Sequence, residues 1–87
     1  MTRELYTIEC RLLDICREYF SIYIRQDNQD KNFFSQYIDF DDISLVYMVL
    51  IVEEEYNIEF SQADFKSDSF FNFDGFVSHV YNLIHMK

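Results

Sequence analysis

The sequence has no proline and a single glycine, Gly75, so its turns must rely on Asn, Asp and Ser. Basic residues are also few: seven Lys and Arg stand against sixteen Asp and Glu, a formal net charge of −9. Such a surface repels nucleic acid phosphates, whereas it suits a basic protein partner or simply keeps the protein in solution. The 87 residues are enough for one domain, which we place at residues 1–87.

Long apolar runs are missing as well. The longest, residues 45–52, is far shorter than the roughly 20 residues of a membrane-spanning helix. The N-terminal residues contain no apolar signal region, so we expect a cytoplasmic protein. Cys10 and Cys16 lie six residues apart, roughly 240° around a helix, and therefore cannot form a disulfide within it. No Cys or His spacing indicates a metal site.

Aromatic residues are plentiful: ten Phe and seven Tyr favour a packed globular chain. Apolar residues at steps of three and four predict a first helix over residues 3–20. The expected core stripe of this helix is Leu5, Ile8, Leu12, Ile15 and Tyr19. Cys16 lies beside the stripe and is expected in the core, and Cys10 on the opposite side is expected to be exposed.

A polar stretch, residues 25–32, predicts a solvated loop. Apolar anchors follow that would hold the loop across the bundle: Phe33, Phe34, Tyr37 and Ile38. The spacing of Phe34 and Ile38 is consistent with a short helical turn between them.

A second helix is expected to start at Asp41 or Asp42, because a carboxylate there caps the free amides and meets the positive end of the helix dipole. It should end near Asn57, which tolerates a left-handed conformation. The segment is rich in β-branched residues that favour a strand, but its length, its caps and the glutamates at residues 53–55 favour a helix.

A brief element at residues 61–67 follows, with Phe60, Ala63 and Phe65 as apolar contacts. Asn72 is expected to cap a final helix with Asp74 in its first turn. Its inward-facing residues would be Phe73, Phe76, Val77, Val80, Tyr81 and Ile84.

The two histidines, His79 and His85, lie on this final helix without an acidic or cysteine residue at ligand spacing, so we expect a surface or boundary role for both. We find no nucleophile–base pair, metal set or phosphate loop in the sequence. We therefore expect that the protein is not an enzyme.

This order of elements resembles the acyl carrier protein superfamily. Residues 53–60, EEEYNIEF, are similar to the acidic segment that ends the second helix in that family. Counting back without gaps, Asp41 falls on the Asp and Ile43 on the Leu of the family's Asp-Ser-Leu motif. Residues 63–80 resemble the D-alanine carrier branch, with a small insertion before Phe70. The resemblance implies an all-α bundle of three longer helices and one short helix, with a long first loop.

The family attaches 4′-phosphopantetheine to the motif Ser, and Asp42 occupies that position here. A carboxylate cannot form the phosphodiester, so the resemblance predicts that the usual attachment is lost. Ser44, two residues on, is the alternative attachment residue, but placing it on the motif requires a deletion before Glu53. The family's Gly before the motif is replaced by Asp39.

The resemblance also predicts a partner-binding face on the second helix, where the family mixes acids with apolar residues. The matching residues are Ile43, Val46, Tyr47, Leu50, Ile51, Glu53 and Glu54, with Ser44 among them. Because Met48, Val49, Val52 and Tyr56 already supply a core side, the helix would be apolar on two faces. Either the loop with Phe33, Phe34 and Tyr37 covers the second face, or another protein does, including a second copy.

Two functions follow as hypotheses. The first is a carrier-like scaffold without a prosthetic group, acting beside acyl-, aminoacyl- or peptide-modifying enzymes, as some carrier-related proteins do in peptide maturation. The second is a working carrier with 4′-phosphopantetheine on Ser44.

Overall fold

The computed structural model describes residues 3–86, and this part of the chain is helical without a strand, which confirms the all-α prediction. The α-helices are α1 (Arg3–Phe20), α2 (Asp42–Tyr56), α3 (Gln62–Lys66) and α4 (Phe73–His85). Two 3₁₀ turns, η1 (Gln26–Asn28) and η2 (Asp68–Phe71), complete the order. Three longer helices, one short helix and a long first loop were the elements expected.

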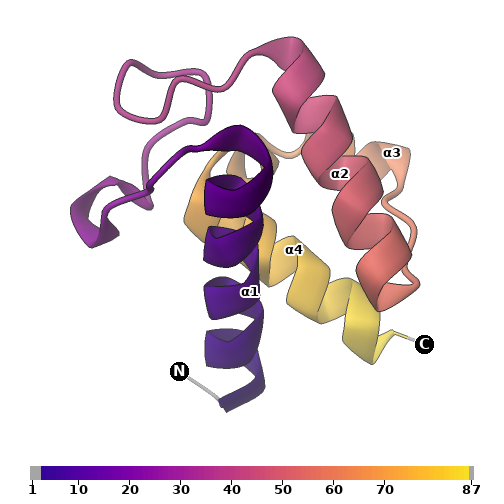
Figure 1. Cartoon of the computed structure of the whole chain (residues 1–87). Coiled ribbons are helices and arrows are strands. Elements are labelled where there is room, and N and C mark those ends of the chain that lie inside the picture. Colours follow the sequence, from indigo (N-terminus) through magenta and orange to yellow (C-terminus); the bar gives the residue numbers. More distant parts are fainter. Residues whose placement is uncertain (1–2, 87) are drawn as a thin grey trace.

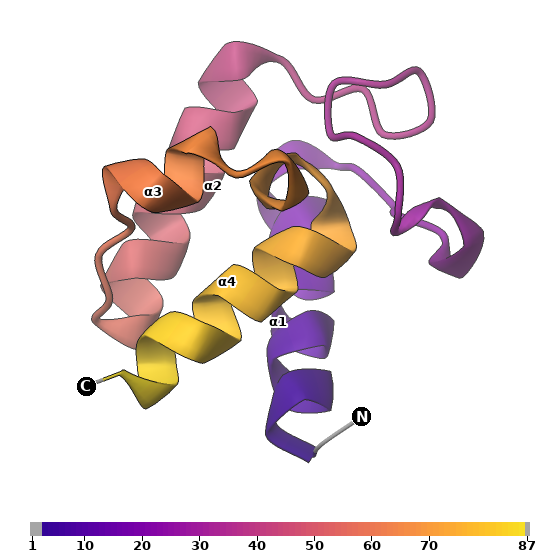
Figure 2. The same cartoon turned by 180° about the vertical axis from the view of Figure 1, so that it is seen from behind.

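The helices form a small bundle in which α4 packs across α1 and α2 lies against α1 (Figure 1). The loop between α1 and α2 extends away from the bundle before returning to the head of α2. From behind, α3 lies beside α2, and η2 connects it to the start of α4 (Figure 2).

The polar residues predicted to end or cap α2 and to cap α4 lie at those helix ends, and α3 has a capping box that was not predicted. The Asp41 carboxylate accepts the backbone N–H of Ser44 at 2.7 Å and so caps α2. At the other end of α2, Asn57 is left-handed, with φ 53°. Ser61 and Asp64 form a reciprocal capping box on α3. The remaining cap, on α4, is Asn72.

The inner stripe of α1 is mostly as predicted. Ile8, Leu12 and Ile15 are buried, as is Cys16. The prediction for Tyr19 was wrong, because its side chain is 59 % exposed. The next residue, Phe20, packs instead, since its ring lies 5.3 Å from the ring of Phe40 in the returning loop. Cys10 was predicted to be exposed, but it is half-buried.

The first loop is anchored by Phe33, which is completely buried between Phe40 and Phe76. Ile38 is buried as well, whereas Phe34 and Tyr37 are exposed. The chain makes one hydrogen-bonded turn here, in which the N–H groups of Ile38 and Asp39 both donate to the Ser35 carbonyl, and this agrees with the predicted short turn.

The polar stretch at residues 25–32 is less solvated than predicted, because Gln29 is buried. Its carbonyl accepts the Asp74 backbone N–H at 2.9 Å. Oriented to donate, its side-chain amide reaches the carboxylates of Glu9 at 2.7 Å and Asp74 at 3.2 Å. Gln29 therefore ties the loop to both α1 and α4.

Aromatic rings fill the space between α3 and α4. The ring of Phe70 contacts the rings of Phe60 at 5.2 Å and Phe76 at 5.1 Å. Phe65 is 42 % exposed, yet its ring lies 5.1 Å from Phe70. Ala63, predicted as a core contact, is exposed.

Candidate functional site

The helix α2 is apolar on two faces, as expected. Its inner face is buried and comprises Leu45, Met48, Val49 and Val52. Its outer face is exposed and comprises Ile43, Val46, Tyr47 and Leu50, each more than half accessible. The first loop does not cover this outer face, since Phe33 lies in the core and Phe34 and Tyr37 are themselves exposed. Ile51, also predicted for this face, is half-buried.

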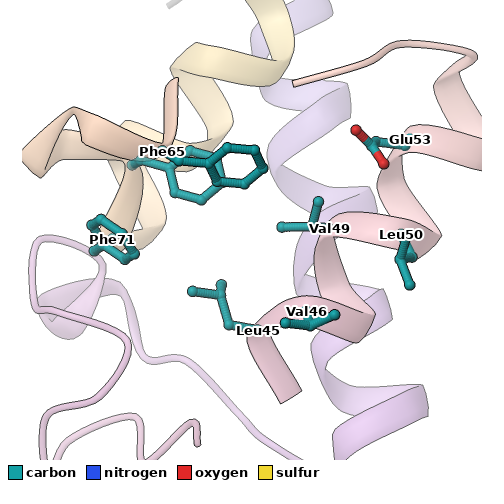
Figure 3. Close-up of a pocket in the computed structure, with 8 residues that line it drawn as sticks. Leu45, Val46, Val49, Leu50, Glu53, Phe65 and Phe71 are labelled. Carbon is teal, nitrogen blue, oxygen red and sulfur yellow. The ribbon is translucent and has the colours of Figure 1, made fainter. Parts of the chain in front are cut away.

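A cavity of about 340 Å³ lies along the edge of the outer face, between α2 and the α3–η2 segment. Leu45 and Val49 point across it toward Phe65 and Phe71 (Figure 3). Its lining is almost entirely apolar, and its one charged lining residue is Glu53. Such a cavity suits an aliphatic or aromatic group better than a polar ligand.

The three glutamates at the end of α2 have different surroundings. Glu53 is half-buried and accepts the Phe60 backbone N–H at 2.9 Å. Glu55 binds the Arg11 guanidinium through both carboxylate oxygens at 2.6 Å, which joins α2 to α1. Glu54 is exposed and, among the described residues, makes no ion pair. Of the two glutamates predicted to meet a partner, Glu54 is the better placed.

The head of α2 carries the residues at which a carrier protein would be modified. The backbone N–H of Ser44 holds the pKa of the Asp41 carboxyl below its usual value. Asp42 is exposed and has no hydroxyl for a phosphodiester, so this position does not fit 4′-phosphopantetheine. Ser44 has the required hydroxyl but is half-buried.

Asp39, which the resemblance aligns with a Gly of carrier proteins, has a φ of 65°. This left-handed conformation is the one that favours glycine, and Asp tolerates it better than most other residues. The backbone before α2 therefore has the geometry that a glycine would adopt, although the side chain differs.

A polar cluster that the sequence analysis did not identify lies on the other side of Phe70. The His79 imidazole binds the Asp64 carboxylate at 2.7 Å and the Ser69 hydroxyl at 3.1 Å. Helical spacing gave no hint of this contact, because Asp64 is fifteen residues from His79 and lies on another helix. His85 likewise binds a distant carboxylate, that of Glu4 at 2.5 Å.

No family model matches this chain, and neither a curated protein nor a solved structure does. The resemblance to carrier proteins therefore stands on the residues and the element order given above. No helix within residues 3–86 combines the length and apolar character of a membrane span. Over the same residues, no three His, Cys, Asp or Glu side chains gather where they could hold a metal ion.

Proposed function

We propose that this protein is an acyl-carrier-like binding module that lacks 4′-phosphopantetheine and docks a protein partner on the outer face of α2. The observation that carries the proposal is the row of large apolar side chains left exposed along this helix beside an apolar cavity. Contiguous apolar surface of this kind on a small domain marks a contact site for another molecule. The partner belongs with acyl-, aminoacyl- or peptide-modifying enzymes.

Charge defines the chemistry of the partner. Residues 32–65 contain eight acidic side chains and no Lys or Arg. The acids are Asp39, Asp41, Asp42, Glu53, Glu54, Glu55, Glu59 and Asp64. Asp41 and Asp42 lie at the start of α2, and Glu53 and Glu54 lie near its end, so acids stand at both ends of the apolar row. We therefore expect an amphipathic partner helix whose apolar face fits the row and whose flanks carry Lys or Arg.

The same charges argue against a second copy as the occupant. A dimer formed through α2 would bring Asp41, Asp42, Glu53 and Glu54 of two copies together, and α2 itself carries no Lys or Arg to compensate them. Like charges across an interface oppose association. Light scattering at high protein concentration and moderate salt should accordingly report a monomer.

Docking is tested with a designed peptide helix of leucines flanked by lysines, because its chemistry matches the expected partner. Binding, followed by calorimetry, should weaken as salt is added. Leu50→Glu should weaken it at least tenfold while leaving the unfolding midpoint nearly unchanged, since Leu50 is exposed. Ser78→Ala on α4 is the matched surface control. Equal binding by Leu50→Glu and the unaltered protein would contradict the proposal.

The absence of the prosthetic group is tested separately by intact mass after incubation with coenzyme A and a phosphopantetheinyl transferase of broad specificity. We expect no gain in mass, and we expect Asp42→Ser to gain one phosphopantetheine, because it restores the hydroxyl at the motif position. A known carrier in the same tube shows that the transferase is active. A gain by the unaltered protein that disappears in Ser44→Ala would instead establish Ser44 as the attachment residue.

A further inference from the structure

Three polar side chains from three separate elements meet at one point of the surface. Asp64 comes from α3, Ser69 from η2 and His79 from α4. The Nδ1 atom of His79 lies 2.7 Å from Oδ1 of Asp64, and its Nε2 atom lies 3.1 Å from Oγ of Ser69. A hydroxyl, an imidazole and a carboxylate thus form one hydrogen-bonded row, the arrangement in which a base activates a nucleophile.

The direction of the hydrogen bonds follows from the Asp64 carboxylate. Burial raises its pKa, but the Ser61 N–H and His79 hydrogen bonds outweigh this effect, so the pKa is lowered overall. An ionised carboxylate can only accept hydrogen bonds, so the proton of a neutral imidazole lies on Nδ1 of His79. Its Nε2 atom then has a free lone pair that accepts the Ser69 hydroxyl, and the Ser67 hydroxyl, 2.9 Å away, donates to the Ser69 oxygen.

The base is held rigidly while the nucleophile is open to solvent. The Asp64 and His79 side chains are 14 % and 18 % exposed, whereas Ser69 is exposed. The ring of Phe70 packs edge-on against the His79 imidazole at 5.7 Å. Asp64 is fixed in turn by the backbone N–H of Ser61 at 2.8 Å. A small reagent can therefore reach the Ser69 oxygen without moving the base.

We propose that Ser69 is an activated nucleophile that accepts an acyl group from an activated ester of a short carboxylic acid. Its Oγ attacks the carbonyl carbon and forms the new C–O bond, while the hydroxyl proton passes to Nε2 of His79. The bond from carbon to the leaving group then breaks, and the leaving group departs with the electron pair and takes up the proton. His79 is the general base, and Asp64 is a positioning residue that acts through it.

This inference is independent of the docking surface on α2, because none of its three residues lies on that helix. Phe70 lines the α2 cavity and its ring also contacts His79, whereas none of the three residues of the row lines that cavity. The row supplies a nucleophile, a base and an orienting carboxylate. We expect Ser69 to take up one acyl group per molecule.

The test uses p-nitrophenyl acetate as the probe, with release of nitrophenolate and intact mass as readouts and peptide mapping to locate the acetyl group. We expect one acetyl group on Ser69, its loss in Ser69→Ala, and a rate at least tenfold lower in His79→Gln. The matched control is His85→Gln, which removes a carboxylate-bound histidine from the same helix and should change the rate less than twofold.

A purely structural role for the row predicts different results. Acetyl groups would then appear on residues other than Ser69, or Ser69 would be acetylated equally fast with and without His79. Either result overturns the proposal. Should His79→Gln fail to fold, Asp64→Asn and the pH profile replace it. The rate on Ser69 should rise with pH, because a general base must be unprotonated to accept the hydroxyl proton, and a rate on Ser69 that is flat with pH also overturns the proposal.

Discussion

Gly75 and Ser69 approach so closely that no other residue type fits at position 75. A Cβ atom there would lie 1.7 Å from the carbonyl oxygen of Ser69 and 2.5 Å from its carbonyl carbon. Gly75 is in the first turn of α4, and its N–H donates to the Asn72 cap at 2.7 Å. The single glycine of the chain is therefore required by the packing of η2 on α4 rather than by a left-handed turn.

We expect Gly75→Ala to destabilise the protein by about 1–3 kcal/mol, because the obstructing atoms are backbone and cannot rotate away. For a domain of this size each kcal/mol corresponds to about 4–8 °C in the unfolding midpoint. Thermal unfolding followed by circular dichroism measures the change. Ser78→Ala, on the exposed side of the same helix, should stay within about 0.5 kcal/mol. An unchanged midpoint for Gly75→Ala would contradict this close packing.

Asp39 allows a second prediction, because its φ of 65° strains most side chains. A β-branched residue is least able to adopt this conformation, so Asp39→Val should cost about 1–2 kcal/mol. Asp39→Gly relieves the strain but gives the unfolded chain more freedom, an opposing effect of about 0.4–1 kcal/mol. It should therefore be nearly neutral. Urea denaturation of both variants gives the order, and a Val variant as stable as the Gly variant would refute the argument.

Much of the fold was predictable because its signals are local. Asp41, Asn57 and Asn72 lie at the helix ends to which their chemistry assigned them. The prediction of the inner stripe of α1 also rested on local spacing, and it was wrong only in the last turn of the helix. There Phe20 rather than Tyr19 is drawn inward by Phe40, a residue twenty positions further along the chain.

The sequence could not predict what depends on distant parts of the chain. No periodicity indicates that Gln29 is buried between two carboxylates, since they belong to α1 and α4. The row of Asp64, Ser69 and His79 was missed for the same reason, because three elements must pack before it exists. The sequence predicted the apolar outer face of α2. It could not predict whether the first loop covers that face, because the answer depends on Phe33 packing in the core.

The Arg11–Glu55 pair supplies the last prediction, on pH. The Arg11 hydrogen bonds hold the pKa of Glu55 below its usual value, against the smaller opposing effect of burial. Because the folded-state pKa is the lower one, this contribution to stability is present above the unfolded pKa of about 4.3. It is lost as pH falls through the folded pKa.

We therefore expect Glu55→Gln to cost about 0.5–1 kcal/mol at pH 7, as is usual for a partly exposed but bidentate pair. The difference between the variant and the unaltered protein should shrink steadily as pH falls below about 4. Urea denaturation at a series of pH values measures it. Glu54→Gln removes the same charge from the neighbouring exposed position and should cost nothing at pH 7. Equal losses in the two variants would show that net charge, and not the bond between α1 and α2, sets the effect.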